Sequence, residues 1–261
     1  MHDSNNKHLY FVIANWKMYT TYRQSIQLFD EYMRAYDYEN SNSVSIIVCP
    51  PVLALASLAN KIVEPILLGS QTCSPFPHGP HTGQIDAPSL QELAIRFCVV
   101  GHAEQRREQY VNNDTITEQL RILLKHTISP ILCIGESIVE KQADQTFAIL
   151  AQQLEPLFSL IEHFRPEVPL IIAYEPLWAI GSSHTPPLEE LAIIVKTLHD
   201  WCTQKAPYAS WHILYGGSID VSRAKMYLPI PHLSGFMIGK ISTGVKLFFD
   251  IVGTCNTYIK T

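Results

Sequence analysis

The stretch that decides the fold is one strand followed by one helix. Residues 169–176 read "PLIIAYEP", and residues 187–201 read "PLEELAIIVKTLHDW". The first segment has a continuous apolar run, which is typical of a strand covered on both faces in a parallel sheet. The second segment has apolar residues at helical spacing with polar residues between them. Together they predict a strand-then-helix unit.

The same unit recurs along the whole chain. Eight apolar segments predict strands, at residues 9–17, 43–51, 65–72, 97–102, 129–136, 169–176, 210–218 and 234–240. Amphipathic segments follow them, at residues 22–36, 52–62, 89–96, 114–127, 143–161, 187–201, 220–227 and 244–252. Eight such units in 261 residues predict an α/β protein with a (β/α)8 barrel.

An open doubly wound sheet is the structural alternative to the barrel. It is disfavoured because no GxGxxG turn follows the first predicted strand. Neither a linker nor a shift in composition divides the chain, so we expect residues 1–261 to form a single domain.

Composition excludes several classes of protein. Hydrophobic residues make up 47% of the chain and charged residues 16%, so a large buried core is expected. A net charge of -5 argues against binding to nucleic acid or to a membrane surface. The apolar run at residues 9–14 is too short for a signal-peptide core or a membrane span. We therefore expect a cytoplasmic protein.

The six cysteines and eleven histidines show no metal-binding pattern. Neither CxxC nor HExxH spacing occurs. Buried thiols in a reducing compartment are expected in preference to disulfides or a zinc site. The sequence thus predicts neither a metal nor an organic cofactor.

Polar residues and glycines gather at the ends of the predicted strands. The strand ends read "NWK" at 15–17, "CPP" at 49–51, "QT" at 71–72, "GHAE" at 101–104, "CIGE" at 133–136, "YEP" at 174–176, "YGGS" at 215–218 and "GK" at 239–240. In a (β/α)8 barrel the carboxyl ends of all strands meet at one rim, where active sites lie. A lysine, a histidine and several carboxylates are therefore expected to converge.

These motifs carry a resemblance to a known family. "NWKM" at 15–18, "GHAE" at 101–104, "LCIGE" at 132–136, "AYEPLWAIG" at 173–181, "YGGS" at 215–218 and "GFMIGK" at 235–240 follow one another as in triosephosphate isomerases. The chain resembles that family over essentially its whole length. The resemblance implies an aldose–ketose isomerase that interconverts dihydroxyacetone phosphate and D-glyceraldehyde 3-phosphate through an enediolate.

The resemblance implies roles for five residues at the rim. Glu175 matches the general base, and His102 matches the neutral imidazole that polarises the carbonyl. Lys17 supplies positive charge, Asn15 donates a hydrogen bond, and Glu104 pairs with the lysine. From the residues alone, Glu175 could be a cap or an ion-pair partner and His102 an ordinary core residue.

A lid and a phosphate site are also implied by the resemblance. The lid is the loop at residues 176–187. Its first hinge is Pro176, Leu177 and Trp178, and its tip is Ala179, Ile180 and Gly181, the last of which binds phosphate through its N–H. The amides of Ser218 and Gly239, with a short helix after the last strand, complete the phosphate cradle. Ser183, His184 and two prolines at 186–187 replace the usual end of the lid and predict a stiffer second hinge.

Other departures bear on the substrate. Ala103 replaces a serine that receives the glutamate in the resting state, and Gln105 is either a substitution or a one-residue insertion. Lys240 replaces a glycine at the phosphate site and could add an ammonium contact or crowd the pocket. An isomerase acting on an erythrulose phosphate is therefore the alternative reading.

A phosphate-binding barrel dimer without activity is a reading from another class. It is disfavoured because Asn15, Lys17, His102 and Glu175 are all retained, which an idle site does not require.

The long loop at residues 73–86 resembles the interface loop of the family. Thr82 matches the residue that inserts beside the partner subunit, so a homodimer is implied. Gln84 stands where the family has a glutamate, which changes one charge at that interface.

Overall fold

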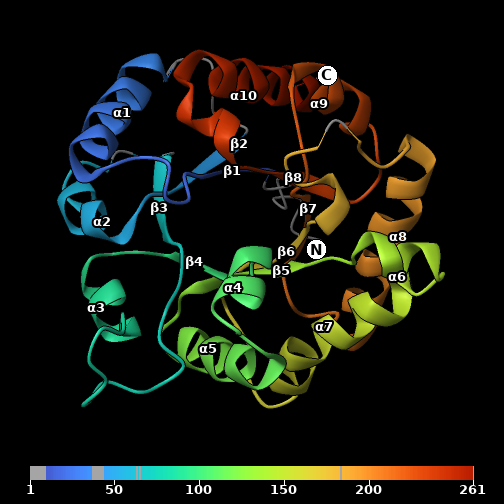
Figure 1. Cartoon of the computed structure of the whole chain (residues 1–261), viewed down its shortest axis with the longest axis horizontal. Coiled ribbons are helices and arrows are strands. Elements are labelled where there is room, and N and C mark those ends of the chain that lie inside the picture. Colours follow the sequence, from blue (N-terminus) through green and yellow to red (C-terminus); the bar gives the residue numbers. More distant parts are fainter. Residues whose placement is uncertain (1–9, 37–43, 63, 65, 183, 261) are drawn as a thin grey trace, which may run out of the picture.

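The fold is a closed barrel of eight parallel strands in chain order, β1 to β8 (Figure 1). A computed structural model describes residues 10–36, 44–62, 64, 66–182 and 184–260. The strands are β1 (Tyr10–Asn15), β2 (Val44–Cys49), β3 (Ile66–Ser70), β4 (Phe97–Val100), β5 (Ser129–Ile134), β6 (Leu170–Tyr174), β7 (Trp211–Tyr215) and β8 (Leu233–Ile238). The predicted (β/α)8 barrel is confirmed.

Helices surround the barrel (Figure 1). They are α1 (Tyr22–Ala35), α2 (Val52–Ala59), α3 (Ala87–Glu92), α4 (Ala103–Glu108), α5 (Asn113–Lys125), α6 (Ile138–Gln142), α7 (Thr146–Ile161), α8 (Leu188–Lys205), α9 (Val221–Tyr227) and α10 (Val245–Ile259), with 3-10 turns η1 (Leu177–Ala179) and η2 (Lys240–Thr243). Each of the eight predicted helical segments overlaps a helix of the structure.

Two separate hydrophobic clusters explain why the strands are apolar throughout. One fills the barrel interior and includes Phe11, Ile131 and Met237. The other lies between the barrel and its helices and includes Val12 and Leu132. Successive side chains of a strand point to opposite faces, so both faces of the strands are largely buried and most of their residues are apolar.

The cysteines are buried as predicted. All six are free thiols. Burial raises the pKa of the Cys49 and Cys202 thiols to about 12, so both are protonated at neutral pH. Among the described residues, no helix is long and apolar enough to cross a membrane.

The barrel closes where β8 pairs with β1, and this seam depends on a glycine. Gly235 pairs with Phe11 at a φ of 144°, a conformation that L side chains rarely adopt. A Cβ atom there would lie 1.8 Å from the Phe11 carbonyl oxygen. Only glycine allows the two strands to approach this closely.

We predict that Gly235→Ala lowers the free energy of unfolding by more than about 3 kcal/mol, because it forces the two seam strands apart. Urea unfolding measures the change. Gly253→Ala is the control: Gly253 lies in α10, a Cβ there meets no atom within 4 Å, and alanine should stabilise the helix by about 0.5–1 kcal/mol. Equal effects of the two substitutions would contradict the role given to Gly235.

Candidate active site

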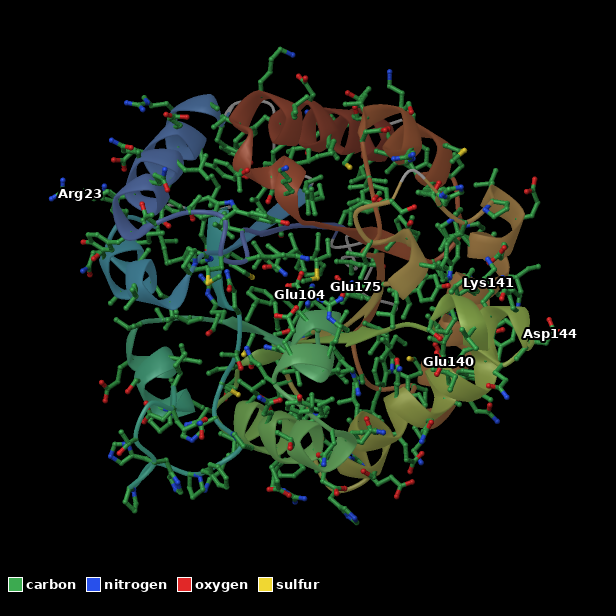
Figure 2. All side chains as sticks on the ribbon, in the orientation of Figure 1. Arg23, Glu104, Glu140, Lys141, Asp144 and Glu175 are labelled. Atoms are coloured by element: carbon green, nitrogen blue, oxygen red, sulfur yellow. The ribbon has the colours of Figure 1, made fainter. Side chains whose placement is uncertain are left out.

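A cavity of about 430 Å3 opens at the carboxyl ends of the strands. Ten of the predicted site residues line it: Asn15, Lys17, His102, Glu104, Glu175, Ile180, Gly181, Ser218, Gly239 and Lys240. Glu104 and Glu175 lie near the centre of the barrel mouth (Figure 2). The cavity thus gathers residues that β1, β4, β6, β7 and β8 deliver from across the chain.

Lys17 is held in a strained backbone conformation at the end of β1. Its φ is 47°, in the left-handed region that non-glycine residues seldom occupy. Its backbone N–H donates to Asn15 Oδ1 at 3.1 Å, and its carbonyl accepts from Gln71 Nε2 at 2.8 Å. These contacts offset the strain and fix the direction of the side chain.

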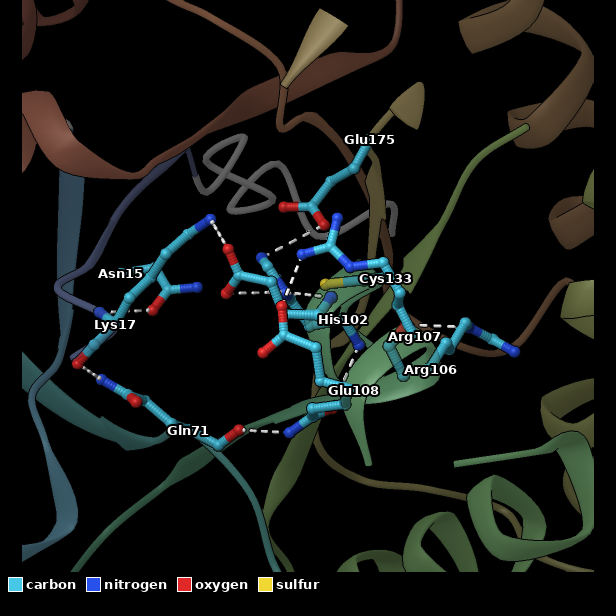
Figure 3. A network of polar contacts seen from close by, with 12 residues as sticks. Asn15, Lys17, Gln71, His102, Arg106, Arg107, Glu108, Cys133 and Glu175 are labelled. Carbon is cyan, nitrogen blue, oxygen red and sulfur yellow. Dashed lines mark hydrogen bonds and ion pairs between the residues drawn. The ribbon is translucent and has the colours of Figure 1, made fainter. Parts of the chain in front are cut away.

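The Lys17 ammonium is aimed into the cavity by an ion pair. Its Nζ lies 2.7 Å from Glu104 Oε1, and the lysine side chain is only 15% exposed (Figure 3). The pair and its hydrogen bond to Lys17 hold the pKa of Glu104 below its usual value, although burial alone would raise it. The lysine therefore presents a fixed positive charge over Gly239, where a Cβ would lie 3.5 Å from Lys17 Cε.

His102 is the N-cap of α4, which fixes its ring. Nδ1 accepts a hydrogen bond from the Glu104 backbone N–H at 3.2 Å, and Gln105 closes a capping box by accepting from the His102 N–H at 3.1 Å. Because Nδ1 is an acceptor, a neutral ring carries its one proton on Nε2. The donor nitrogen faces the cavity.

Glu175 follows β6 and is the most deeply buried carboxylate of the cavity, with 4% of the residue exposed. Its Oε2 lies 3.5 Å from His102 Nε2 and takes no hydrogen bond (Figure 3). Burial raises the pKa of this carboxyl, while His102 and Lys17 lower it. A carboxylate with a free lone pair and a raised pKa is suited to accept a proton.

The far end of the cavity is built from backbone. Gly181, Ser218 and Gly239 lie on its wall, and η2 begins immediately after Gly239. Lys240 is exposed, lines the cavity and is not among the described residues with positive φ. Clustered amides and a cation are suited to an anion such as phosphate.

Comparison with known proteins identifies the family. The family model described as triosephosphate isomerase matches residues 10–255. This chain belongs to the triosephosphate isomerase family. Proteins named triosephosphate isomerase from Chlamydia muridarum, Aquifex aeolicus and Mycoplasmopsis agalactiae are 32%, 31% and 30% identical to it. The matches cover 93%, 92% and 93% of this chain and 90%, 97% and 95% of those relatives.

The lid of this triosephosphate isomerase family member packs against a buried carboxylate. Trp178 Nε1 donates to Glu136 Oε1 at 2.8 Å, and the Leu177 N–H donates to the Glu136 carbonyl at 2.9 Å. At the tip, the Ser218 hydroxyl donates to the Ala179 carbonyl at 2.9 Å. Ile180 lines the cavity, Pro176 is the N-cap of η1, and Ser183 lies outside the described residues.

Thr82, the predicted interface residue, is not among the residues that line the cavity. It is exposed, in the loop between β3 and α3. The same loop exposes Phe76, whose ring stacks on His81 with centroids 4.5 Å apart. The exposed position of Thr82 is compatible with the interface role that the sequence implies.

Two residues that support the site were not predicted from the sequence. Gln71 Nε2 donates to the Lys17 carbonyl and, at 3.0 Å, to the Cys49 carbonyl, tying β1 to β2. Glu136 ends the "LCIGE" motif, but its partners were not predicted. Its oxygens accept from both Tyr174 and Trp178.

Among the described residues, no group of three His, Cys, Asp or Glu side chains could hold a metal ion.

We predict that Glu175→Gln stabilises the folded chain at pH 8 by on the order of 1 kcal/mol. Because burial raises the pKa of Glu175, its contribution to stability falls as pH rises from about 4.3, the usual carboxyl value, through the raised value. The advantage of the variant should therefore widen from pH 5 to pH 8 in urea unfolding.

The matched control is Glu162→Gln. Glu162 is exposed, and its pair with Lys205 lowers its pKa, so its contribution has the opposite sign. An advantage of Glu175→Gln that did not change with pH would contradict the burial argument.

Proposed function

We propose that this chain is a triose-phosphate isomerase that interconverts dihydroxyacetone phosphate and D-glyceraldehyde 3-phosphate, a step of glycolysis and gluconeogenesis. One observation carries the proposal. A buried carboxylate of Glu175 lies 3.5 Å from the donor nitrogen of His102, in a cavity that also holds the Lys17 ammonium. A base, a hydrogen-bond donor and a fixed cation are the three groups that proton transfer beside a carbonyl needs.

The proposed reaction is a proton transfer between adjacent carbons. Glu175 removes a proton from the carbon beside the carbonyl. The C–H electron pair forms a C=C bond, and the C=O π pair moves onto the carbonyl oxygen to give an enediolate. The Nε2–H of His102 donates to the carbonyl oxygen and handles the proton that moves between the two oxygens. Glu175 then returns its proton to the neighbouring carbon, which regenerates the carboxylate and completes the isomerisation.

Charge stabilisation is assigned to the β1 end. The Lys17 ammonium and the Asn15 amide face the oxygens on which negative charge develops, and Glu104 keeps the lysine in place. The hydrogen bonds that hold the strained Lys17 backbone support the proposal that its ammonium is positioned before the substrate binds.

Substrate phosphate is assigned to the opposite end of the cavity. The amides of Gly181, Ser218 and Gly239 would bind its oxygens, and the Lys240 ammonium would add a point charge. The lid residues would exclude water from the enediolate during the reaction.

The triose substrate is preferred to an erythrulose phosphate. All three relatives described above are named triosephosphate isomerase. The Lys240 substitution is therefore taken as a change in how phosphate is held.

We further propose a homodimer of single-domain subunits spanning residues 1–261. The segments that follow β1, β2 and β3, three neighbouring strands, expose Met18 (93%), Leu53 in α2 (79%) and Phe76 (47%). Apolar groups gathered on one side of a rim are typical of a subunit interface. The six reduced thiols support a cytoplasmic location.

Turnover of dihydroxyacetone phosphate by the purified chain tests the proposed activity. We predict that Glu175→Gln lowers kcat by about 10²–10⁴-fold, because an amide cannot accept the proton. Glu118→Gln, an exposed glutamate paired with Arg121, should leave kcat unchanged. Absence of turnover by the unmodified chain, or full activity of Glu175→Gln, would falsify the proposal.

A charge placed on the proposed interface tests the dimer. We predict that Met18→Glu weakens dimerisation by at least about 30-fold, because a buried unpaired carboxylate costs roughly 2 kcal/mol or more. Sedimentation velocity measures the change. Leu247→Glu, on the exposed face of α10 at 55% exposure, is the control and should not alter the oligomer. A monomeric unmodified chain would show that the assignment is wrong.

A further inference from the structure

Lys141 contacts the first end of the predicted lid, residues 176–187, and a glutamate just beyond its second end. Its ammonium lies 3.9 Å from the centroid of the Trp178 ring, at the first end of the lid. The same ammonium forms an ion pair with Glu190, in the first turn of α8 just beyond the second end. One side chain of α6 thus contacts both a lid residue and the helix that follows the lid.

Trp178 is consequently held on two sides. Its indole N–H donates to Glu136, and its ring face receives the Lys141 ammonium. The Glu136 carboxylate is fully buried, and both its oxygens lie 3.2 Å from the Tyr174 hydroxyl. A cation over an indole face is most favourable when both groups are partly withdrawn from water. Lys141 meets that condition, since its side chain is only 28% exposed.

This cluster is coupled mechanically to the catalytic base. A Cβ at Gly135, next to Glu136, would lie 2.0 Å from the Glu175 carbonyl oxygen, so the backbones of the two loops are in direct contact. The Glu175 N–H also donates to the Ile134 carbonyl at 2.7 Å. The contacts that hold Trp178 against Glu136 therefore also restrain the backbone of Glu175.

We propose that Lys141 is a positioning residue that fastens the lid: it clamps the Trp178 ring onto Glu136 and ties that end of the lid to Glu190. This inference rests on the proposed isomerase function and deepens it. Lys141 does not touch the substrate cavity and acts through Trp178. Without its cation, the arrangement of the lid seen here becomes less populated relative to open arrangements.

Lys141→Met keeps an unbranched apolar side chain and removes the charge. Loss of a cation–π contact of this kind should reduce the population of the fastened lid by about two- to fivefold. KM for dihydroxyacetone phosphate should rise by the same factor, while kcat stays unchanged or increases. A merely structural role would instead reduce the amount of active enzyme, lowering the apparent kcat at constant KM.

A spectroscopic readout separates this inference from the proposed activity. The chain has four tryptophans, so 5-fluorotryptophan labelling gives a short list of ¹⁹F resonances, and Trp178→Phe assigns the lid signal. Lys141→Met should shift that signal, and Lys141→Arg should restore it, because arginine retains the cation over the ring. If the unmodified chain has no isomerase activity, the proposed function is wrong. The Trp178 resonance does not depend on activity and would still test the role of Lys141.

Two further variants complete the experiment. Glu190→Gln removes the tether while keeping Lys141, and should move KM and the Trp178 resonance in the same direction as Lys141→Met. Lys196→Met, which breaks the Lys196–Asp200 pair of α8, is the matched control and should change neither. An unmoved Trp178 resonance with unchanged KM in both Lys141→Met and Glu190→Gln would overturn the inference.

Discussion

The constraint on which the site depends is the burial of the Glu175 carboxylate. A charge taken out of water is costly unless it is compensated by opposite charges and hydrogen bonds. Here the compensation is incomplete, since Oε2 takes no hydrogen bond and Lys17 is itself engaged by Glu104. The carboxylate can therefore take up a proton. The surrounding structure keeps this carboxylate buried at the expense of folding stability.

Two glycines make that burial possible. At Gly216 a Cβ would lie 2.4 Å from Glu175 Cγ, and at Gly135 it would lie 2.0 Å from the Glu175 carbonyl oxygen. Glu175 is thus packed between the ends of β5 and β7, with no room to move sideways. The glycines of the "CIGE" and "YGGS" motifs therefore do more than form turns: they admit the side chain and the backbone of the base.

Most of the fold and the site could be predicted from sequence, because the signals are local. Continuous apolar runs fix strands such as β6, and the polar residues that follow them fall on one rim once the barrel closes. The short helix α6 was not predicted, since five residues without buried side chains carry no apolar periodicity. The support that Gln71 gives Lys17 spans 54 positions, and nothing in the local pattern of either residue indicates it.

Gln105 links two parts of the site that lie far apart in the sequence. In α4 it occupies the third helical position, where its side chain accepts from the His102 N–H and donates to the Gln71 carbonyl at 2.8 Å. A capping box requires this three-residue spacing, so a side chain one position further along would not reach the N-cap. Gln105 therefore joins the N-cap histidine to the glutamine that holds the Lys17 carbonyl, and both ends of the cavity's β1–β4 side depend on it.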